Sequence, residues 1–82
     1  MSIGIYRGHE FDYDPIKNAI TMDDKVVYRD DGIGEVNLRE CADGNETWES
    51  GKIFTLDDFI TEIVIPMLET KYGYDLAFEG LK

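Results

Sequence analysis

The sequence predicts an α+β protein in which an antiparallel sheet of four to five strands, formed by residues ~2–54, is packed by one C-terminal helix, ~56–72. Two observations carry this prediction. Apolar and polar residues alternate with a period of two as far as about residue 54, and they follow a helical period beyond it. Clusters rich in Asp, Asn, Pro and Gly separate the alternating segments. The 82 residues are expected to form a single domain, 1–82.

The alternating segments are interpreted as strands in chain order. They are "GIYRG", "HEFDYD", "AITM", "KVVYR" and "GEVNLREC", which end at Gly8, Asp14, Met22, Arg29 and Cys41. In "HEFDYD", Phe11 and Tyr13 share one face of the strand, and the acids share the other. "ETWES" and "KIFT" are interpreted as a further short hairpin or edge strand. The positions expected to point inward are Ile20, Met22, Val26, Tyr28, Val36 and Leu38.

The helix is predicted from its ends and from its apolar stripe. Thr55 followed by Asp58 resembles a capping box, and Gly73 stands where a glycine would end the helix. Pro66 falls inside the helix and is expected to kink it, because proline removes a backbone hydrogen bond. The stripe that is expected to pack on the sheet comprises Leu56, Phe59, Ile60, Ile63, Val64, Met67 and Leu68.

The charge balance restricts the function. Eighteen Asp and Glu residues against eight Lys and Arg residues give a formal net charge of −10. Direct binding to nucleic acid or to an anionic membrane surface is therefore disfavoured, because both depend on clustered cations. No stretch approaches the roughly 20 apolar residues of a membrane span, and the start "MSIGIYRGHE" has no secretory signal pattern. These features favour a cytoplasmic location.

No constellation in the sequence indicates catalysis or a cofactor. His9 is the only histidine, and its neighbour Glu10 points to the opposite face of the same strand. No carboxylate or nucleophile from another strand is indicated for it. Cys41 is more simply a buried structural thiol. One His and one Cys make no structural zinc site, and the "DDG" cluster does not fit a calcium-binding loop. We therefore expect no enzyme, no catalytic or metal-binding residues and no cofactor. The alternative is a small enzyme or metal-dependent binder, in which His9 and at least two carboxylates from neighbouring strands would converge in one cleft.

The acids are the remaining functional signal. We hypothesise a small non-enzymatic protein-binding module whose acidic surface engages a basic protein partner. Such a surface could imitate nucleic acid and block a nucleic-acid-binding site, as an inhibitor or adaptor of the kind found among phage and mobile-element accessory proteins. The opposing interpretation is that the acidity only keeps the protein soluble. The carboxylates predicted to bind the partner in the first part of the chain are Glu10, Asp12, Asp14, Asp23, Asp24, Asp30 and Asp31.

A second hypothesis is a structural module that forms a homodimer through its helix. On an ideal helix Ile65 points about 180° away from Leu56, and Tyr72 lies about 20° from Ile65. The two residues are therefore expected to form a small exposed contact patch, unless a kink at Pro66 rotates Ile65 into the core. The acids predicted to surround this patch and to contact a partner are Asp58, Glu62 and Glu69.

Overall fold

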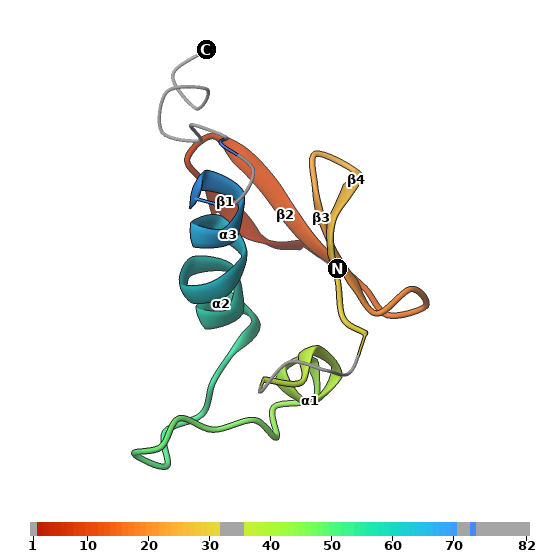
Figure 1. Ribbon diagram of the computed structural model, residues 1–82. Coiled ribbons are helices and arrows are strands. Elements are labelled where there is room, and N and C mark those ends of the chain that lie inside the picture. Colours follow the sequence, from red (N-terminus) through yellow and green to blue (C-terminus); the bar gives the residue numbers. More distant parts are fainter. Residues whose placement is uncertain (1, 32–35, 71–72, 74–82) are drawn as a thin grey trace.

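The fold is an antiparallel sheet of four strands and a helix that covers one of its faces. The computed structural model describes residues 2–31, 36–70 and 73 (Figure 1). The strands are β1 (Ser2–Tyr6), β2 (His9–Asp14), β3 (Ala19–Met22) and β4 (Lys25–Arg29), and they neighbour one another in the order β1-β2-β3-β4. Each strand thus pairs with the strand that precedes it in the chain. The predicted α+β class and antiparallel sheet are confirmed.

Two of the connections are two-residue turns. Arg7 and Gly8 join β1 to β2, and Asp23 and Asp24 join β3 to β4, and all four have positive φ values of 51 to 83°. This is the backbone of the tight hairpin turns whose twist matches that of the flanking strands. The longer β2–β3 turn ends at Asn18, whose φ is 49°.

A β-bulge changes which residues of β4 point toward the core. The pairing of β3 with β4 shifts between Ile20 and Thr21, so that Thr21 pairs with Val26 while Ile20 pairs with Tyr28. The extra residue, Val27, packs against the core, and Val26 is 39% exposed on the outer face. The prediction that Val26 points inward was wrong. The other predicted inward residues, Ile20, Met22, Tyr28, Val36 and Leu38, are buried or pack against the core.

The predicted fifth strand was also wrong, because a helix forms there. Residues 34–41 were expected to form it, but Leu38–Ala42 form a short helix, α1, and residues 34 and 35 lie outside the described part of the chain. The Asn37 side chain accepts a hydrogen bond from the Glu40 backbone N–H at 3.1 Å and caps this helix. Leu38 and Cys41, three residues apart, both enter the core. "ETWES" and "KIFT" pair through a single bridge, Thr47 with Ile53, rather than as strands.

The C-terminal helix runs without a break through α2 (Leu56–Phe59), a π-helical segment η1 (Ile60–Val64) and α3 (Ile65–Thr70). The capping box is confirmed: Thr55 Oγ1 accepts from the Asp58 N–H at 3.1 Å, and Asp58 accepts from the Thr55 N–H at 3.0 Å. The expected kink near Pro66 is not confirmed. The predicted helix end at Tyr72 lies outside the described residues, and Gly73 has a φ of +73°.

Because of the π-helical segment, Ile65 points in a different direction from the one predicted for an ideal α-helix. The Ile65 N–H bonds to the Ile60 carbonyl, five residues back, so the turn before Pro66 holds more residues than an α-helical turn. Each residue then advances by less than 100° around the axis, which rotates Ile65 toward the sheet. Ile65 is 5% exposed and belongs to the core. The predicted exposed patch is therefore wrong for Ile65, and Tyr72 lies outside the described residues.

Candidate functional site

The sheet face opposite the helix presents carboxylates from two places. On β2, Phe11 and Tyr13 are buried toward the helix, and Glu10, Asp12 and Asp14 alternate with them on the outer face. Asp24 comes to the same face from the β3–β4 turn. We call Glu10, Asp12, Asp14 and Asp24 the acidic face. Its alternation on β2 is what the sequence predicted.

Three of these carboxylates surround one hollow. Asp12, Asp14 and Asp24 line a cavity of about 370 Å³. The remaining lining residues are Tyr13, Pro15, Lys17, Thr21 and Val26. Register explains the arrangement, because Asp12 pairs with Thr21, which pairs in turn with Val26. Lys17 is a cation of this hollow, and Arg29 lies in the same cross-strand row as Asp14, because Asp14 pairs with Ala19 and Ala19 pairs with Arg29.

The turn beside the hollow is held by several hydrogen bonds. Asp14 Oδ1 accepts from the backbone N–H groups of Ile16 and Lys17 at 3.0 and 3.2 Å. Tyr13 donates its hydroxyl hydrogen to the Asn18 side chain at 3.0 Å, and Arg39 donates to the Pro15 carbonyl at 2.6 Å. The result is a fixed turn whose tip, Ile16, is 94% exposed. Sequence reasoning missed Ile16; an isoleucine inside the polar turn "DPIKN" was the available signal.

Other predicted partner-binding acids bond within the protein. Asp58 caps the C-terminal helix, and the Thr55 backbone N–H is the main cause that lowers its pKa. Asp30 accepts from the Leu38 N–H at 2.8 Å, and Glu69 forms an ion pair with Arg7.

Glu62 lies exposed on η1, in the layer that covers the other face of the sheet. Asp31 is exposed after β4. The structure therefore does not gather these residues with the acidic face.

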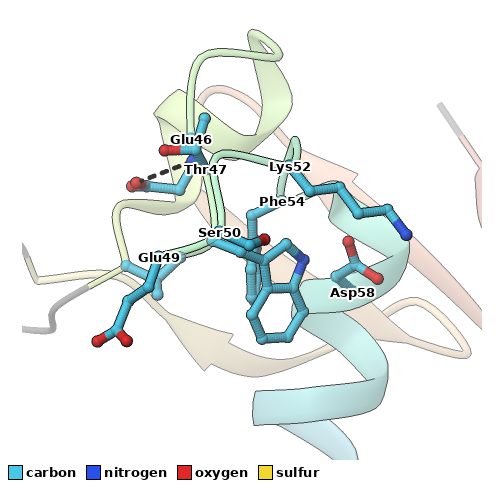
Figure 2. A pocket seen from close by; sticks show the side chains of 9 residues that line it. Glu46, Thr47, Glu49, Ser50, Lys52, Phe54 and Asp58 are labelled. Atoms are coloured by element: carbon cyan, nitrogen blue, oxygen red, sulfur yellow. Dashed lines mark hydrogen bonds between the residues drawn. The ribbon is translucent and has the colours of Figure 1, made fainter.

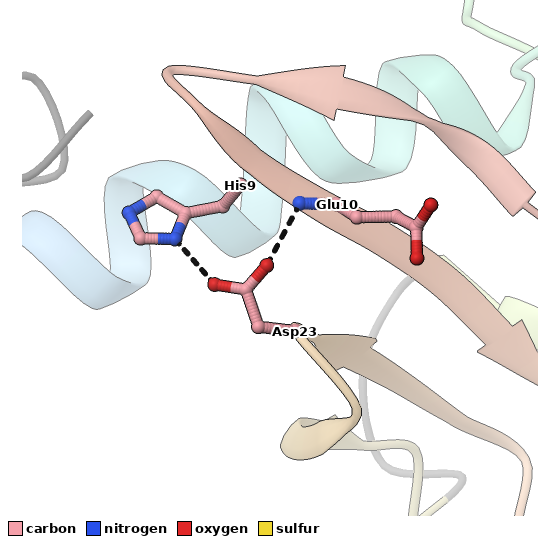
Figure 3. A network of polar contacts seen from close by, with 3 residues as sticks. All are labelled: His9, Glu10 and Asp23. Carbon is pink, nitrogen blue, oxygen red and sulfur yellow. Dashed lines mark hydrogen bonds and ion pairs between the residues drawn. The ribbon is translucent and has the colours of Figure 1, made fainter. Parts of the chain in front are cut away.

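His9 has a partner that the sequence did not indicate. Its Nδ1 lies 2.6 Å from Asp23 Oδ2, and the other oxygen of Asp23 accepts from the Glu10 backbone N–H at 3.0 Å (Figure 3). The hydrogen bond with His9, followed by the Glu10 N–H, lowers the pKa of Asp23. Asp23 thus ties the β3–β4 turn to β2. Fourteen residues separate the two side chains, so only the strand register brings them together.

The side chains near this pair and the single thiol of the chain differ in how they are placed. The Glu10 carboxylate extends away from His9 in Figure 3. Cys41 is buried in α1, and burial raises the pKa of its thiol to about 12, far from a reactive thiolate. Within residues 2–31, 36–70 and 73, no group of three or more His, Cys, Asp or Glu side chains could hold a metal ion.

Another cavity lies elsewhere, lined mainly by the segment that connects α1 to α2. It measures about 900 Å³ and includes Trp48, which is 37% exposed (Figure 2). The sequence left open whether Trp48 belongs to the core or to a contact surface. Its ring packs on buried Phe54, with centroids 4.6 Å apart, while part of it faces solvent.

Comparison with known proteins adds no assignment. The chain significantly matches no family model, no curated protein and no solved structure. In the part of the chain that is described, no helix is both long enough and apolar enough to cross a membrane.

Proposed function

We propose that this protein is a non-enzymatic binding module whose acidic face engages a basic surface of a protein partner. The observation that carries the proposal is the convergence of Asp12, Asp14 and Asp24 around one hollow on the outer face of the sheet. Phosphate backbones and acidic surfaces attract the same clustered Lys and Arg side chains. A nucleic-acid-binding protein is therefore a fitting partner, and an inhibitor of such a protein a fitting role.

The turn next to the acidic face supplies the apolar part of this interface. Charged pairs at a rim mainly set the association rate and the specificity, whereas affinity depends on apolar anchors that fill pockets. Ile16 is highly exposed on a turn fixed by the bonds of Asp14 and Arg39. A fixed anchor loses little conformational entropy on binding. We therefore assign Ile16 as the anchor and the acidic face as the surface that orients the partner.

A matched pair of charge variants tests the proposal. Replacing Glu10, Asp12 and Asp24 by Lys reverses three charges and changes the formal net charge by six, from −10 to −4. Replacing Glu40, Asp43 and Glu62 by Lys gives the same net charge but leaves the acidic face intact. Each protein would be immobilised, exposed to lysate and eluted with a salt gradient, and the captured proteins identified by mass spectrometry.

The expected result is that the parent and the control triple retain the same basic partner and release it as salt rises, while the acidic-face triple does not bind it. Equal loss in both triples would show that net charge alone acts, and retention by the acidic-face triple would place the contact elsewhere. Ile16→Ser should weaken binding of the captured, purified partner at least tenfold while the urea midpoint of the protein stays unchanged.

The homodimer hypothesis loses its central contact, because Ile65 is buried. For the alternative of a small enzyme or metal-dependent binder that uses His9, the carboxylate in contact with the histidine is that of Asp23. Light scattering on the parent protein remains a direct check. A monomeric mass at high concentration agrees with the proposed module. A dimer that dissociates on Ile16→Ser would show that the turn forms a contact between two copies of the chain.

A further inference from the structure

The groove around Trp48 has the composition of a binding site. It occupies about 900 Å³. Its lining residues are Val36, Glu46, Thr47, Trp48, Glu49, Ser50, Lys52, Phe54 and Asp58. A partly exposed aromatic ring, a buried aromatic ring behind it and several fixed polar groups are the features that ligand sites combine. None of these residues belongs to the acidic face.

The exposed indole is held in position. The backbone N–H of Trp48 donates to the Lys52 carbonyl at 2.7 Å, and the backbone N–H of Gly51 donates to the Trp48 carbonyl at 2.8 Å. Gly51 closes this turn with a φ of +90°, a conformation that glycine adopts without strain. The ring itself packs on Phe54 at 4.6 Å, with the planes inclined by 52°. The backbone turn and the contact with Phe54 thus orient the indole, part of which faces solvent at the groove.

The groove carries more negative than positive charge. Glu46, Glu49 and Asp58 line it, against one cation, Lys52. Asp58 and Lys52 lie on one side in the view of Figure 2, and Glu46 and Glu49 lie on the other. The charge of Lys52 acts on Asp58, as one of the lesser causes of its lowered pKa. The negative charge of the groove is therefore least compensated on the side of Glu46 and Glu49.

The Glu46 carboxylate is already oriented. Its two oxygens accept from the backbone N–H groups of Asn37 and Thr47, at 3.1 and 3.3 Å. A carboxylate oxygen can accept more than one hydrogen bond, so Glu46 retains acceptor capacity. Glu49 is exposed beside it. Both residues line the same groove as the partly exposed Trp48 ring, and Figure 2 shows them on the side away from Asp58. A groove that offers an aromatic ring and carboxylates suits a planar cation.

We propose that this groove binds the guanidinium group of an arginine side chain in a basic peptide segment of a partner. Arginine fits both halves of the site, because its planar group stacks on aromatic rings and donates in a fork to carboxylates. Lysine, a compact and strongly hydrated ammonium, matches the carboxylates but not the stacking surface. The inference goes beyond the acidic face and identifies a second, chemically more specific contact point.

The experiment uses the fact that Trp48 is the only tryptophan of the chain, so intrinsic fluorescence reports directly on the groove. The probes are blocked pentapeptides, Gly-Gly-X-Gly-Gly, in which X is arginine, citrulline or lysine. Citrulline has nearly the shape of arginine but no charge. We expect a saturable change in fluorescence for the arginine peptide, with a Kd on the order of 1 mM, and at least tenfold weaker binding of the citrulline peptide.

Two substitutions locate the site. Glu49→Gln should weaken binding of the arginine peptide at least threefold, and Glu40→Gln, an equal change of charge on α1, should leave it unchanged.

The Lys triple variant at Glu10, Asp12 and Asp24 should bind the peptide as the parent does, so failure of the acidic face and failure of this groove are distinguishable. Trp48→Phe, followed by chemical shifts of the backbone amides, should weaken but not abolish binding, because phenylalanine stacks less strongly with a cation.

Four results would overturn the assignment, and three of them concern the arginine site directly. These are the absence of a saturable fluorescence change, citrulline binding equal to that of arginine, and an unchanged affinity in Glu49→Gln. Lysine binding as tight as that of arginine would also overturn it, because it would show that charge acts without the planar group.

Discussion

The two layers of the fold and the segment between them, residues 36–54, are stabilised in different ways. Six of the seven largest fully buried side chains lie in the sheet or the C-terminal helix, and Leu38 is the one from the connecting segment. The connecting segment depends instead on hydrogen bonds from side chains to backbone, such as those of Asn37 and Glu46. The Trp48 groove is built from this second region. The proposed binding groove thus lies where apolar burial is least, which is the region expected to open most readily.

The largest expected effect is the slow chemical labelling of Cys41, the single thiol of the chain, which lies in the connecting segment. Burial, followed by the charge of Glu46, raises its pKa from 9.0 to about 12. A shift of about three units lowers the thiolate fraction roughly a thousandfold, so labelling by a thiol reagent should be slower by at least that factor than in the unfolded chain.

Urea then tells local from global opening. If the connecting segment opens by itself, the labelling rate should stay nearly constant at low urea and rise only near the unfolding transition. We expect this result. A rate that follows the global unfolding free energy from the lowest urea concentrations would show that the connecting segment and the two layers form one cooperative unit.

The next largest effect tests the layered core. Phe59 is fully buried and meets the Tyr28 ring edge-on, with centroids 5.2 Å apart. Phe59→Ala should lower the free energy of unfolding by about 3–5 kcal/mol, because it removes apolar contacts and leaves a cavity between sheet and helix. Urea unfolding followed by circular dichroism measures the change. Phe54→Leu, a milder change in the connecting segment, should cost less than half as much, and equal losses would contradict the contrast between the regions.

A smaller loss is expected where the two regions join. Thr55→Ala removes the side chain that accepts the Asp58 N–H and should cost about 1 kcal/mol of stability. Thr55→Ser keeps the hydroxyl group and is the matched control, with near-parental stability. If both variants lose the same amount, the methyl group of Thr55 rather than the helix cap is responsible.

Acid sensitivity gives a separate measure of the same junction. The Thr55 backbone N–H, then the Thr55 hydroxyl, the Trp48 side chain and Lys52 lower the pKa of Asp58 below 3.8. A lowered folded-state pKa stabilises the fold above the unfolded-state value, and this stability is lost as pH falls through the folded-state pKa. Urea midpoints measured from neutral pH downward should therefore fall less steeply in Asp58→Asn than in the parent. Glu62→Gln, which removes an exposed carboxylate of the same helix, should retain the parental slope.

The same contrast explains which features the sequence predicts. Phe11 and Tyr13 alternate with acids because β2 is buried on one face only, and a period of two reveals this directly. The helix stripe follows for the same reason, except at Ile65, which the π-helical segment rotates into the core. Pro66 indicated that the helix is irregular near that point, but it did not indicate a π-helical segment.

The errors fall where periodicity is ambiguous or absent. Val36 and Leu38 alternate as in a strand, but Leu38 and Cys41 are also spaced as on a helix face. Asn37 followed by Glu40 was the capping signal that favours the helix. The His9–Asp23 pair and the Trp48 groove depend on strand register and on an irregular segment, neither of which a local pattern encodes.

The smallest effect is expected on the outer face, where stability and the proposed function oppose each other. Successive carboxylates on one face of β2 are spaced roughly 6.5–7 Å apart and repel one another. Asp12→Asn should therefore raise the free energy of unfolding by up to about 0.5 kcal/mol at low salt, while it weakens partner capture. The gain should vanish at about 1 M salt, where charges at this distance are screened. Thr21→Val, which changes the neighbouring residue without altering charge, should show no such salt dependence. If Asp12→Asn instead destabilises the protein at every salt concentration, this carboxylate is part of the fold, and its place in the acidic face needs no binding function to explain it.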